Sequence, residues 1–170
     1  MRTYEIADRY RMLDRSEVDL LQDVARMLPR EPICINIGAG TGTSGCAILE
    51  VRPDAFVFSI DKKPEPRERE SLQELGFETS RCLRILSDSA RAGEFWPIPV
   101  DLVFVDGGHT VAQATADTLS WRPRIKKGGY MLFHDYKHRN LPNLTPAIDA
   151  LMEGYERVGE ARYLVAFRIL

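Results

Sequence analysis

Short apolar runs alternate with helical segments along most of this chain, and this alternation restricts its fold more than any other feature. The runs are residues 33–37 (ICINI), 55–60 (AFVFSI), 82–86 (CLRIL), 102–105 (LVFV) and 130–133 (YMLF). Strands that are apolar along most of their length are typical of sheets buried on both faces, and the intervening helices supply the cover. The pattern therefore predicts an α/β fold built on a parallel, doubly wound sheet.

The two ends of the chain depart from this alternation. Residues 16–29 carry apolar side chains at helical spacing, which predicts an amphipathic helix capped by Ser16 within an N-terminal helical segment, residues 1–30. Residues 156–170 contain two strand-like pieces around Gly159 with no helical stretch between them. Strands joined by a short turn are antiparallel, so we expect the sheet to end in a hairpin.

Length, charge and cysteine content narrow the class of protein. A chain of 170 residues that is 44% hydrophobic suffices for one packed core, so we expect a single domain, residues 1–170, with its core in residues 31–170. The net charge of -2 and the lack of a long apolar run predict a cytoplasmic protein with no obligatory nucleic-acid or membrane partner. Cys34, Cys46 and Cys82 lie among apolar residues, as the reduced thiols of a core do.

A glycine-rich turn follows the first predicted strand. Gly38, Gly40 and Gly42 allow the backbone to turn sharply and to approach a ligand closely, and the next helix offers unpaired N–H groups. The dinucleotide fingerprint GxGxxG requires a glycine where Thr43 stands. Asp61 ends the second strand, about 20 residues further along, where nucleotide-binding units keep an acid for the ribose hydroxyls. A nucleotide-containing cofactor is predicted here, and a plain tight turn is the alternative.

The order of these motifs, together with "DLVFVDGGHT" and "GGYMLFHDY", resembles class I S-adenosylmethionine-dependent methyltransferases, in particular a compact group related to small-molecule O-methyltransferases. The resemblance covers residues 30–136. It implies a Rossmann-like sheet of about seven strands, mostly parallel, with an antiparallel C-terminal hairpin. It also implies methyl transfer from S-adenosylmethionine to a hydroxyl group of a small molecule, and a homo-oligomer.

The same resemblance places the cofactor along the glycine turn and the ends of the second and third strands. Asp61 would hold the ribose hydroxyls, and Asp88 with Ser89 would border the adenine, although this pair is also typical of a helix N-cap. Asn36 stands where the family usually has an acid, so it can accept a hydrogen bond but lacks the charge. The implied cofactor-binding residues are Asn36, Gly38, Ala39, Gly40, Thr43, Asp61, Lys62, Asp88, Ser89 and Asp106.

The family fold sets the fourth and fifth strands side by side, which would bring Asp106 opposite His134 and Asp135, with His109 on the loop beyond. These four are the candidate catalytic residues. An imidazole can accept the proton of a reacting hydroxyl. A divalent metal held by Asp106 and Asp135, Mg²⁺ or another, can instead lower the pKa of that hydroxyl, and His134 favours a transition metal. The sequence leaves both routes open, beside purely structural roles in turns or as buried histidines.

Two other functions remain as alternatives. A nicotinamide-dependent oxidoreductase has a similar fold, but Thr43 interrupts its fingerprint. A catalytically silent S-adenosylmethionine-binding or assembly module is compatible with Asn36 and with the small size of the chain. The acceptor is not specified by the sequence, and its pocket can be completed by the first helix, by residues 137–146 (KHRNLPNLTP) or by another subunit.

Overall fold

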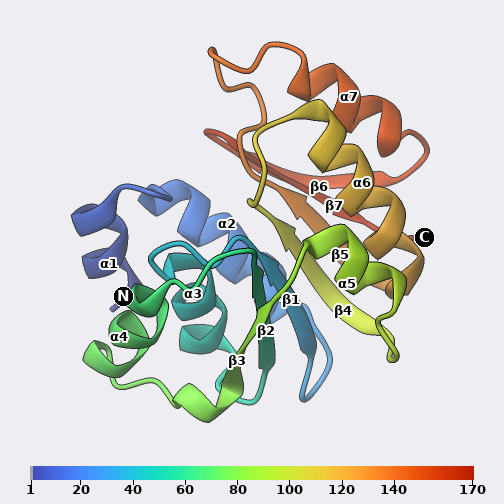
Figure 1. The fold of residues 1–170 in the computed structure, drawn as a ribbon. Helices are drawn as coiled ribbons and strands as arrows, with labels where there is room; N and C mark the ends of the chain where they lie inside the picture. Colours follow the sequence, from blue (N-terminus) through green and yellow to red (C-terminus); the bar gives the residue numbers. More distant parts are fainter. Residues whose placement is uncertain (1) are drawn as a thin grey trace.

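The computed structural model describes residues 2–170, and its centre is a sheet of seven strands (Figure 1). In chain order the strands are β1 (Ile33–Ile37), β2 (Phe56–Asp61), β3 (Cys82–Leu86), β4 (Val100–Val105), β5 (Ile125–Phe133), β6 (Glu156–Ala161) and β7 (Leu164–Arg168). Their order across the sheet is β3-β2-β1-β4-β5-β7-β6. Strands β1 to β5 are parallel, and β7 runs antiparallel to both β5 and β6. The predicted fold class is confirmed.

Helices cover both faces of this sheet. They are α1 (Thr3–Tyr10), α2 (Arg15–Arg26), α3 (Thr43–Val51), α4 (Pro66–Glu74), α5 (Ser89–Glu94), α6 (Val111–Trp121) and α7 (Leu144–Leu151), with short 3₁₀ turns at Thr79–Arg81 and Arg122–Arg124. Helices α1 to α4 lie on one face and α5 to α7 on the other (Figure 1).

The central strand β4 is buried along its whole length. Its residues alternate between the two faces: Leu102 and Phe104 pack with α1 to α4, whereas Val103 and Val105 pack with α5 to α7. Trp121 of α6 is also fully buried in the second of these cores. The unbroken apolar run in this strand therefore reflects burial on both faces, as predicted.

Strand β5 differs from its prediction at one end. It begins at Ile125, ahead of the two glycines that were expected to lead into it. The pairing of β4 with β5 shifts register between Val100 and Leu102, and a β-carbon on Gly129 would lie only 2.7 Å from the carbonyl oxygen of Asp101. The glycine therefore accommodates an irregularity inside the strand. In the sequence, the same glycine pair looks like the start of a strand.

The N-cap of α2 is Asp14, so the expected cap at Ser16 is wrong. Ser16 lies inside the first turn of the helix, and its hydroxyl donates to Asp14 Oδ1 over 2.7 Å. Asp14 Oδ1 accepts from the backbone N–H of Glu17 (3.1 Å), and Glu17 Oε2 accepts from the N–H of Asp14 (2.7 Å). This reciprocal capping box fixes the position of Glu17 at the start of the helix.

The cysteines occupy the interior, with one exception. Cys34 and Cys46 are fully buried free thiols, which confirms their predicted place in the core. Cys82 lies half-buried in the edge strand β3. Burial raises the pKa of all three thiols, and they are therefore held in the protonated form.

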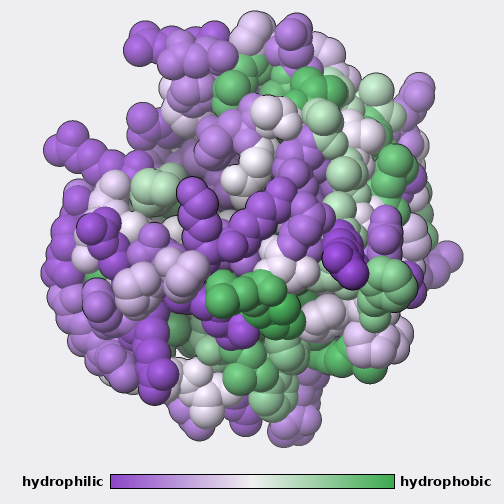
Figure 2. Space-filling view, in the orientation of Figure 1, coloured by the Kyte–Doolittle hydropathy of each residue, from purple (hydrophilic) through white to green (hydrophobic). Residues whose placement is uncertain are grey.

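The face drawn in Figure 2 is largely hydrophilic, with a hydrophobic patch over β3. Leu83 and Leu86 of this edge strand are among the exposed large apolar residues. Within residues 2–170, no helix combines the length and the apolar character that a membrane crossing requires. The cytoplasmic location and the homo-oligomer stay predictions.

The strand order reverses between β1 and β4. The chain adds β2 and β3 on one side of β1 and then returns to build β4 and β5 on the other side. The polar residues that follow β1 and β4 therefore meet at the carboxyl end of the sheet. In open α/β sheets this is the place where ligands bind.

Candidate active site

The glycine turn after β1 is pressed against the end of β4. The N–H of Gly38 donates to the carbonyl of Ile60 in β2 (3.0 Å), and the N–H of Asp106 donates to the carbonyl of Ile37 (2.9 Å). Gly38 has a φ of +87°, and a β-carbon at this position would collide with the backbone carbonyl of Asp106. Only glycine fits both the left-handed backbone and the close approach.

Two cavities lie along this turn, and together they contain most of the residues predicted to bind the cofactor. One, of about 100 Å³, is lined by Gly38, Asp61, Lys62 and Ser89 among others. A smaller one beneath the turn is lined by Ala39, Gly40, Thr43 and Asp106 among others. Asn36 and Asp88 line neither cavity.

Asp61 is half-buried at the end of β2 and faces the larger of these two cavities. Its Oδ2 accepts the backbone N–H of Ala39 over 3.2 Å, and its Oδ1 accepts the N–H of Lys63 over 3.1 Å. The carboxylate thus joins β2 to the glycine turn. Each carboxylate oxygen has a second lone pair, which leaves capacity for hydroxyl donors of a ligand.

Asn36 belongs to the interior. Its side chain is fully buried, with Oδ1 accepting from the hydroxyl of Ser44 (2.9 Å) and Nδ2 donating to the hydroxyl oxygen of Ser59 (3.0 Å). The amide uses both its donor and its acceptor, which a carboxylate cannot do. This residue therefore supports the turn from below, and the structure does not bring it to the cavities where the cofactor residues gather.

Asp88 adopts the helix-capping role that was its alternative interpretation. Its Oδ1 accepts the N–H of Arg91 (3.0 Å) at the start of α5, and its Oδ2 pairs with Lys62 Nζ (2.8 Å). The hydrogen bond with Lys62 lowers the pKa of this carboxyl. Asp88 does not line the cavity, but its ion pair holds the side chain of Lys62, which does line it.

Two polar residues of α6 near Ser89 were missed by sequence reasoning. The hydroxyl of Ser89 donates to Asp117 Oδ1 over 2.5 Å, and Gln113 Nε2 donates to the same oxygen over 3.2 Å. Asp117 is fully buried, and burial raises the pKa of its carboxyl. Gln113 lines the cavity. In the sequence both residues look like the polar face of an amphipathic helix, so no local pattern singled them out.

A third and larger cavity, of about 740 Å³, opens on the other side of Asp106. All four candidate catalytic residues line it, together with residues of α1, α2 and the segment between them, and with His138, Arg162 and Tyr163. Figure 2 shows a hollow with hydrophilic walls between the N-terminal helices and the β6–β7 hairpin. The first helices and the hairpin turn of this same chain therefore complete the pocket, and residues 137–146 contribute His138 to it.

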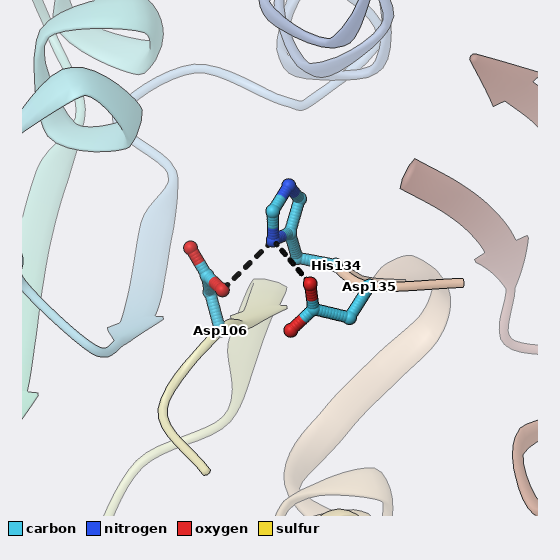
Figure 3. A group of neighbouring side chains, drawn as sticks. All are labelled: Asp106, His134 and Asp135. Atoms are coloured by element: carbon cyan, nitrogen blue, oxygen red, sulfur yellow. Dashed lines mark hydrogen bonds and ion pairs between the residues drawn. The ribbon is translucent and has the colours of Figure 1, made fainter. Parts of the chain in front are cut away.

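Asp106, His134 and Asp135 converge at one end of this cavity (Figure 3). Nδ1 of His134 lies 3.0 Å from Asp106 Oδ1 and 3.6 Å from Asp135 Oδ1. One ligand atom from each of the three residues lies within 4.8 Å of the others. Asp135 Oδ2 is hydrogen-bonded to Nδ1 of His109, whose side chain is exposed. The structure thus brings together the four side chains from the ends of β4 and β5.

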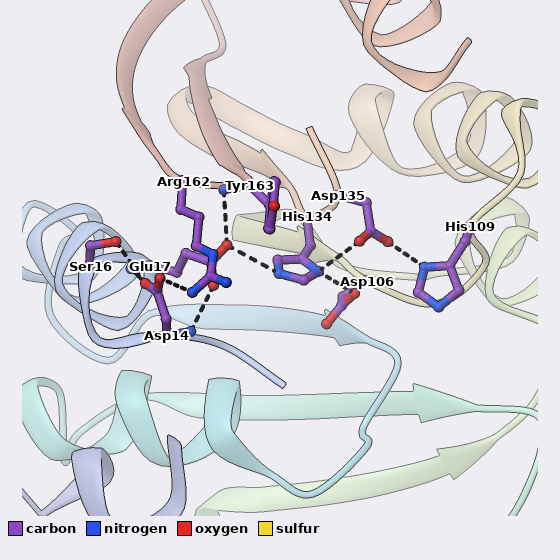
Figure 4. A network of polar contacts seen from close by, with 9 residues as sticks. All are labelled: Asp14, Ser16, Glu17, Asp106, His109, His134, Asp135, Arg162 and Tyr163. Carbon is purple, nitrogen blue, oxygen red and sulfur yellow. Dashed lines mark hydrogen bonds and ion pairs between the residues drawn. The ribbon is translucent and has the colours of Figure 1, made fainter. Parts of the chain in front are cut away.

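His134 lies between carboxylates on both sides (Figure 4). Its Nε2 is 3.4 Å from Oε1 of Glu17, a buried residue of α2 that sequence reasoning did not select. Burial disfavours the charged imidazole, but the hydrogen bond with Asp106 and the nearby carboxylate of Glu17 outweigh it and raise the pKa of His134 to about 10. Burial raises the pKa of Asp106, and the hydrogen bond from His134 opposes that shift. The flanking carboxylates therefore favour the charged form of this imidazole.

The backbone of Asp135 is held in an unusual conformation. Its φ of +60° lies in the left-handed region, which costs most non-glycine residues roughly 1–3 kcal/mol. Both neighbours are fixed: the N–H of His134 donates to the carbonyl of Val105 (3.0 Å), and the N–H of Tyr136 donates to that of Tyr163 (2.9 Å). These two bonds hold the bend that turns the Asp135 carboxylate toward His134 and His109.

This sheet order, with a glycine turn at its point of reversal and an acid at the end of β2, defines the class I S-adenosylmethionine-dependent methyltransferases. The sequence model of the family described as "Methyltransferase domain" matches residues 35–136. This match covers more than half of the chain, which therefore belongs to that methyltransferase family. The nicotinamide-dependent alternative is not favoured by this result.

Solved structures share the same fold at low sequence identity. A protein assigned as a caffeoyl-CoA O-methyltransferase from Staphylococcus aureus is 18% identical, with a TM-score of 0.78 over 97% of this chain and 88% of that one. A protein assigned as a methyltransferase from Streptococcus mutans, solved with S-adenosylhomocysteine, is 16% identical, with a TM-score of 0.68 over 94% and 100%. A protein assigned as an rRNA methylase from Clostridium thermocellum is 14% identical, with a TM-score of 0.74 over 94% and 99%.

The role of Asp61 can be tested against an acid at the other end of the same strand. Asp54 also accepts a backbone N–H, that of Glu31, just before β2. We expect Asp61→Ala to weaken the binding of S-adenosylhomocysteine about tenfold to hundredfold, because a hydrogen bond to a charged group contributes roughly 1.5–3 kcal/mol. Asp54→Ala should bind like the wild type. Titration calorimetry measures both, and equal affinity in Asp61→Ala and wild type would show that Asp61 does not contact the cofactor.

Proposed function

We propose that this chain transfers the methyl group of S-adenosylmethionine to a hydroxyl oxygen of a small molecule. The observation that carries the proposal is the position of Asp106, which lines both the cavity beneath the glycine turn and the large cavity beyond it. A cofactor along the turn and an acceptor in the large cavity would therefore meet at this residue. Methyl transfer requires this alignment of a nucleophile with the sulfonium methyl group.

The walls of the large cavity favour a small acceptor over a nucleic acid. Five carboxylates line it, against the two guanidinium groups of Arg11 and Arg162, and this excess of acids is unfavourable for phosphate groups. A volume of about 740 Å³ is typical of small-molecule sites. These features support a hydroxylated small molecule, even though some proteins of the same fold are assigned as rRNA methylases.

The chemistry requires one nucleophile and one proton acceptor. The acceptor oxygen attacks the methyl carbon, the carbon–sulfur bond breaks with its electron pair going to sulfur, and the hydroxyl proton is released. We assign His109 as the group that accepts this proton. Its Nδ1 is hydrogen-bonded to Asp135, which leaves Nε2 as the nitrogen with a free lone pair. His134 is less suited to this role, because a carboxylate oxygen faces each of its ring nitrogens: Asp106 lies 3.0 Å from Nδ1 and Glu17 lies 3.4 Å from Nε2.

A divalent metal is a second way to activate the acceptor. Asp106, His134 and Asp135 offer two carboxylate oxygens and one imidazole nitrogen within 4.8 Å of one another, and this donor set fits a transition metal such as Mn²⁺ or Zn²⁺. When bound there, a metal would lower the pKa of an acceptor hydroxyl.

The class of acceptor can be established with a labelled methyl group. We expect the purified chain to transfer the methyl of S-adenosylmethionine to members of a panel of phenols and catechols, and not to purified rRNA. Labelled product is counted after extraction. Label found only in rRNA would contradict the small-molecule acceptor, and binding of S-adenosylhomocysteine without transfer to any acceptor would favour the silent module.

The proposed proton acceptor has a matched control within the same cavity. His138 lines this cavity too, but it packs edge-to-face against the ring of Tyr163 and has no carboxylate partner within residues 2–170. We expect His109→Gln to lower kcat by roughly 100- to 10,000-fold, the contribution of a general base. His138→Gln should change kcat far less, and both should bind S-adenosylhomocysteine normally. Similar kcat values in the two variants would remove His109 from the proton transfer.

Metal dependence is decided by chelation and by direct binding. If a metal takes part, EDTA abolishes methyl transfer and Mn²⁺ restores it, and Asp106→Asn lowers the Mn²⁺ affinity about tenfold or more. Asp23→Asn, an exposed acid of α2 outside the cavities, serves as the control. Full activity in EDTA would overturn the metal proposal and leave the proton route through His109.

A further inference from the structure

Glu17 lies outside residues 35–136, the part of the chain that the family model matches, but its side chain contacts His134 of the candidate active site. It is 2% exposed, although it is a charged residue in the first turn of α2. Its Oε2 accepts the N–H of Asp14 (2.7 Å), and its Oε1 accepts the N–H of Tyr163 in the β6–β7 turn (3.0 Å). The same Oε1 lies 3.4 Å from Nε2 of His134 (Figure 4). One carboxylate therefore contacts three separate parts of the chain.

Apart from Glu17, no carboxylate within residues 2–170 pairs with Nε2 of His134. This nitrogen is buried and makes no hydrogen bond of ordinary geometry within residues 2–170. The opposite edge is occupied, since Nδ1 lies 3.0 Å from Asp106 Oδ1. A buried nitrogen of this type needs an acceptor, and the nearest carboxylate oxygen is that of Glu17.

We propose that Glu17 is a positioning residue of the acceptor site, holding the Nε2 edge of His134 so that Nδ1 faces Asp106 and Asp135. A half-turn of the imidazole about its bond to the β-carbon would put Cδ2 in the place of Nδ1 and Cε1 in the place of Nε2, and both contacts with carboxylates would be lost. A carboxylate at each edge selects one orientation and one proton arrangement. The positioning follows from the contacts alone, and its effect on methyl transfer rests on the proposed function.

Glu17 also contributes to the walls of the large cavity. The bond to Tyr163 connects α2 to the hairpin turn, and Asp14 of the same capping box pairs with Arg162 over 2.5 Å. A substitution at Glu17 can therefore affect the pocket by loosening α2 as well as by freeing His134. The test needs a measurement that responds to the histidine ring and a control that loosens the N-terminal helices elsewhere.

Glu50 provides that control. Its side chain accepts the backbone N–H groups of Arg2 (2.7 Å) and Thr3 (3.2 Å) and the amide of Gln22 (3.1 Å). It therefore fixes the N-terminal helices as Glu17 does, but it lies outside the large cavity and makes no contact with His134. Glu50→Gln removes a comparable carboxylate and leaves the histidine ring untouched.

The experiment is proton–nitrogen correlation NMR of the histidine side chains, which is tractable because the chain has only three histidines. Substitution of each histidine in turn assigns the resonances. We expect wild type and Glu50→Gln to show a slowly exchanging Nε2–H for His134. Glu17→Gln has one acceptor oxygen in place of two, and it should lose or strongly broaden this resonance. Glu17→Ala should lose it entirely.

Kinetics supply the second readout. If the proposal holds, Glu17→Gln lowers kcat about 10- to 100-fold while its affinity for S-adenosylhomocysteine stays at the wild-type value. Glu17→Asp, which keeps the charge but is one methylene shorter, should recover less than full activity. An unchanged His134 resonance in Glu17→Gln would overturn the positioning role. A wild type that binds no S-adenosylhomocysteine would instead contradict the proposed function, and the NMR result would still decide the role of Glu17.

Discussion

The close contact between the glycine turn and the end of β4 is the constraint on which the rest of the site depends. Because Gly38 has no side chain, its backbone lies directly against the carbonyl of Asp106, and β1, β2 and β4 end at a common level. This contact places the two cavities along the glycine turn on one side of Asp106 and the large cavity on the other. A bulkier residue here would separate the two strands whose ends form the site.

The sheet and its central chemistry could be predicted because they depend on local patterns. The apolar runs mark buried strands, and ligands gather where parallel strands end, so Asp61, Asp106 and Asp135 could be selected from position alone. Asn36 and Asp88 followed from the same family pattern, but neither lines a cavity. Their amide and carboxyl groups are used within the fold, by a buried serine pair and by a helix N-terminus.

The residues that sequence reasoning missed are polar groups on helices. Gln113 and Asp117 of α6 and Glu17 of α2 occupy positions where a solvent-facing residue is the ordinary expectation. Their burial is set by tertiary contacts with segments distant in the sequence. Glu17, for example, accepts a backbone N–H from Tyr163 in the last hairpin. No spacing rule connects such positions, and the cap of α2 was misplaced for a related reason, since Asp14 and Ser16 are both good capping residues.

The turn between β6 and β7 can vary independently of the sheet. Strand β7 is fixed between β5 and β6 by its own hydrogen bonds, so a change in the length of the turn at Arg162 and Tyr163 need not alter the pairing in the sheet. That turn borders the large cavity but neither of the cavities along the glycine turn. Variation in this turn would therefore reshape the large cavity while the cavities along the glycine turn stay constant. Under the proposed function, this gives the fold a route to new acceptors without loss of its cofactor.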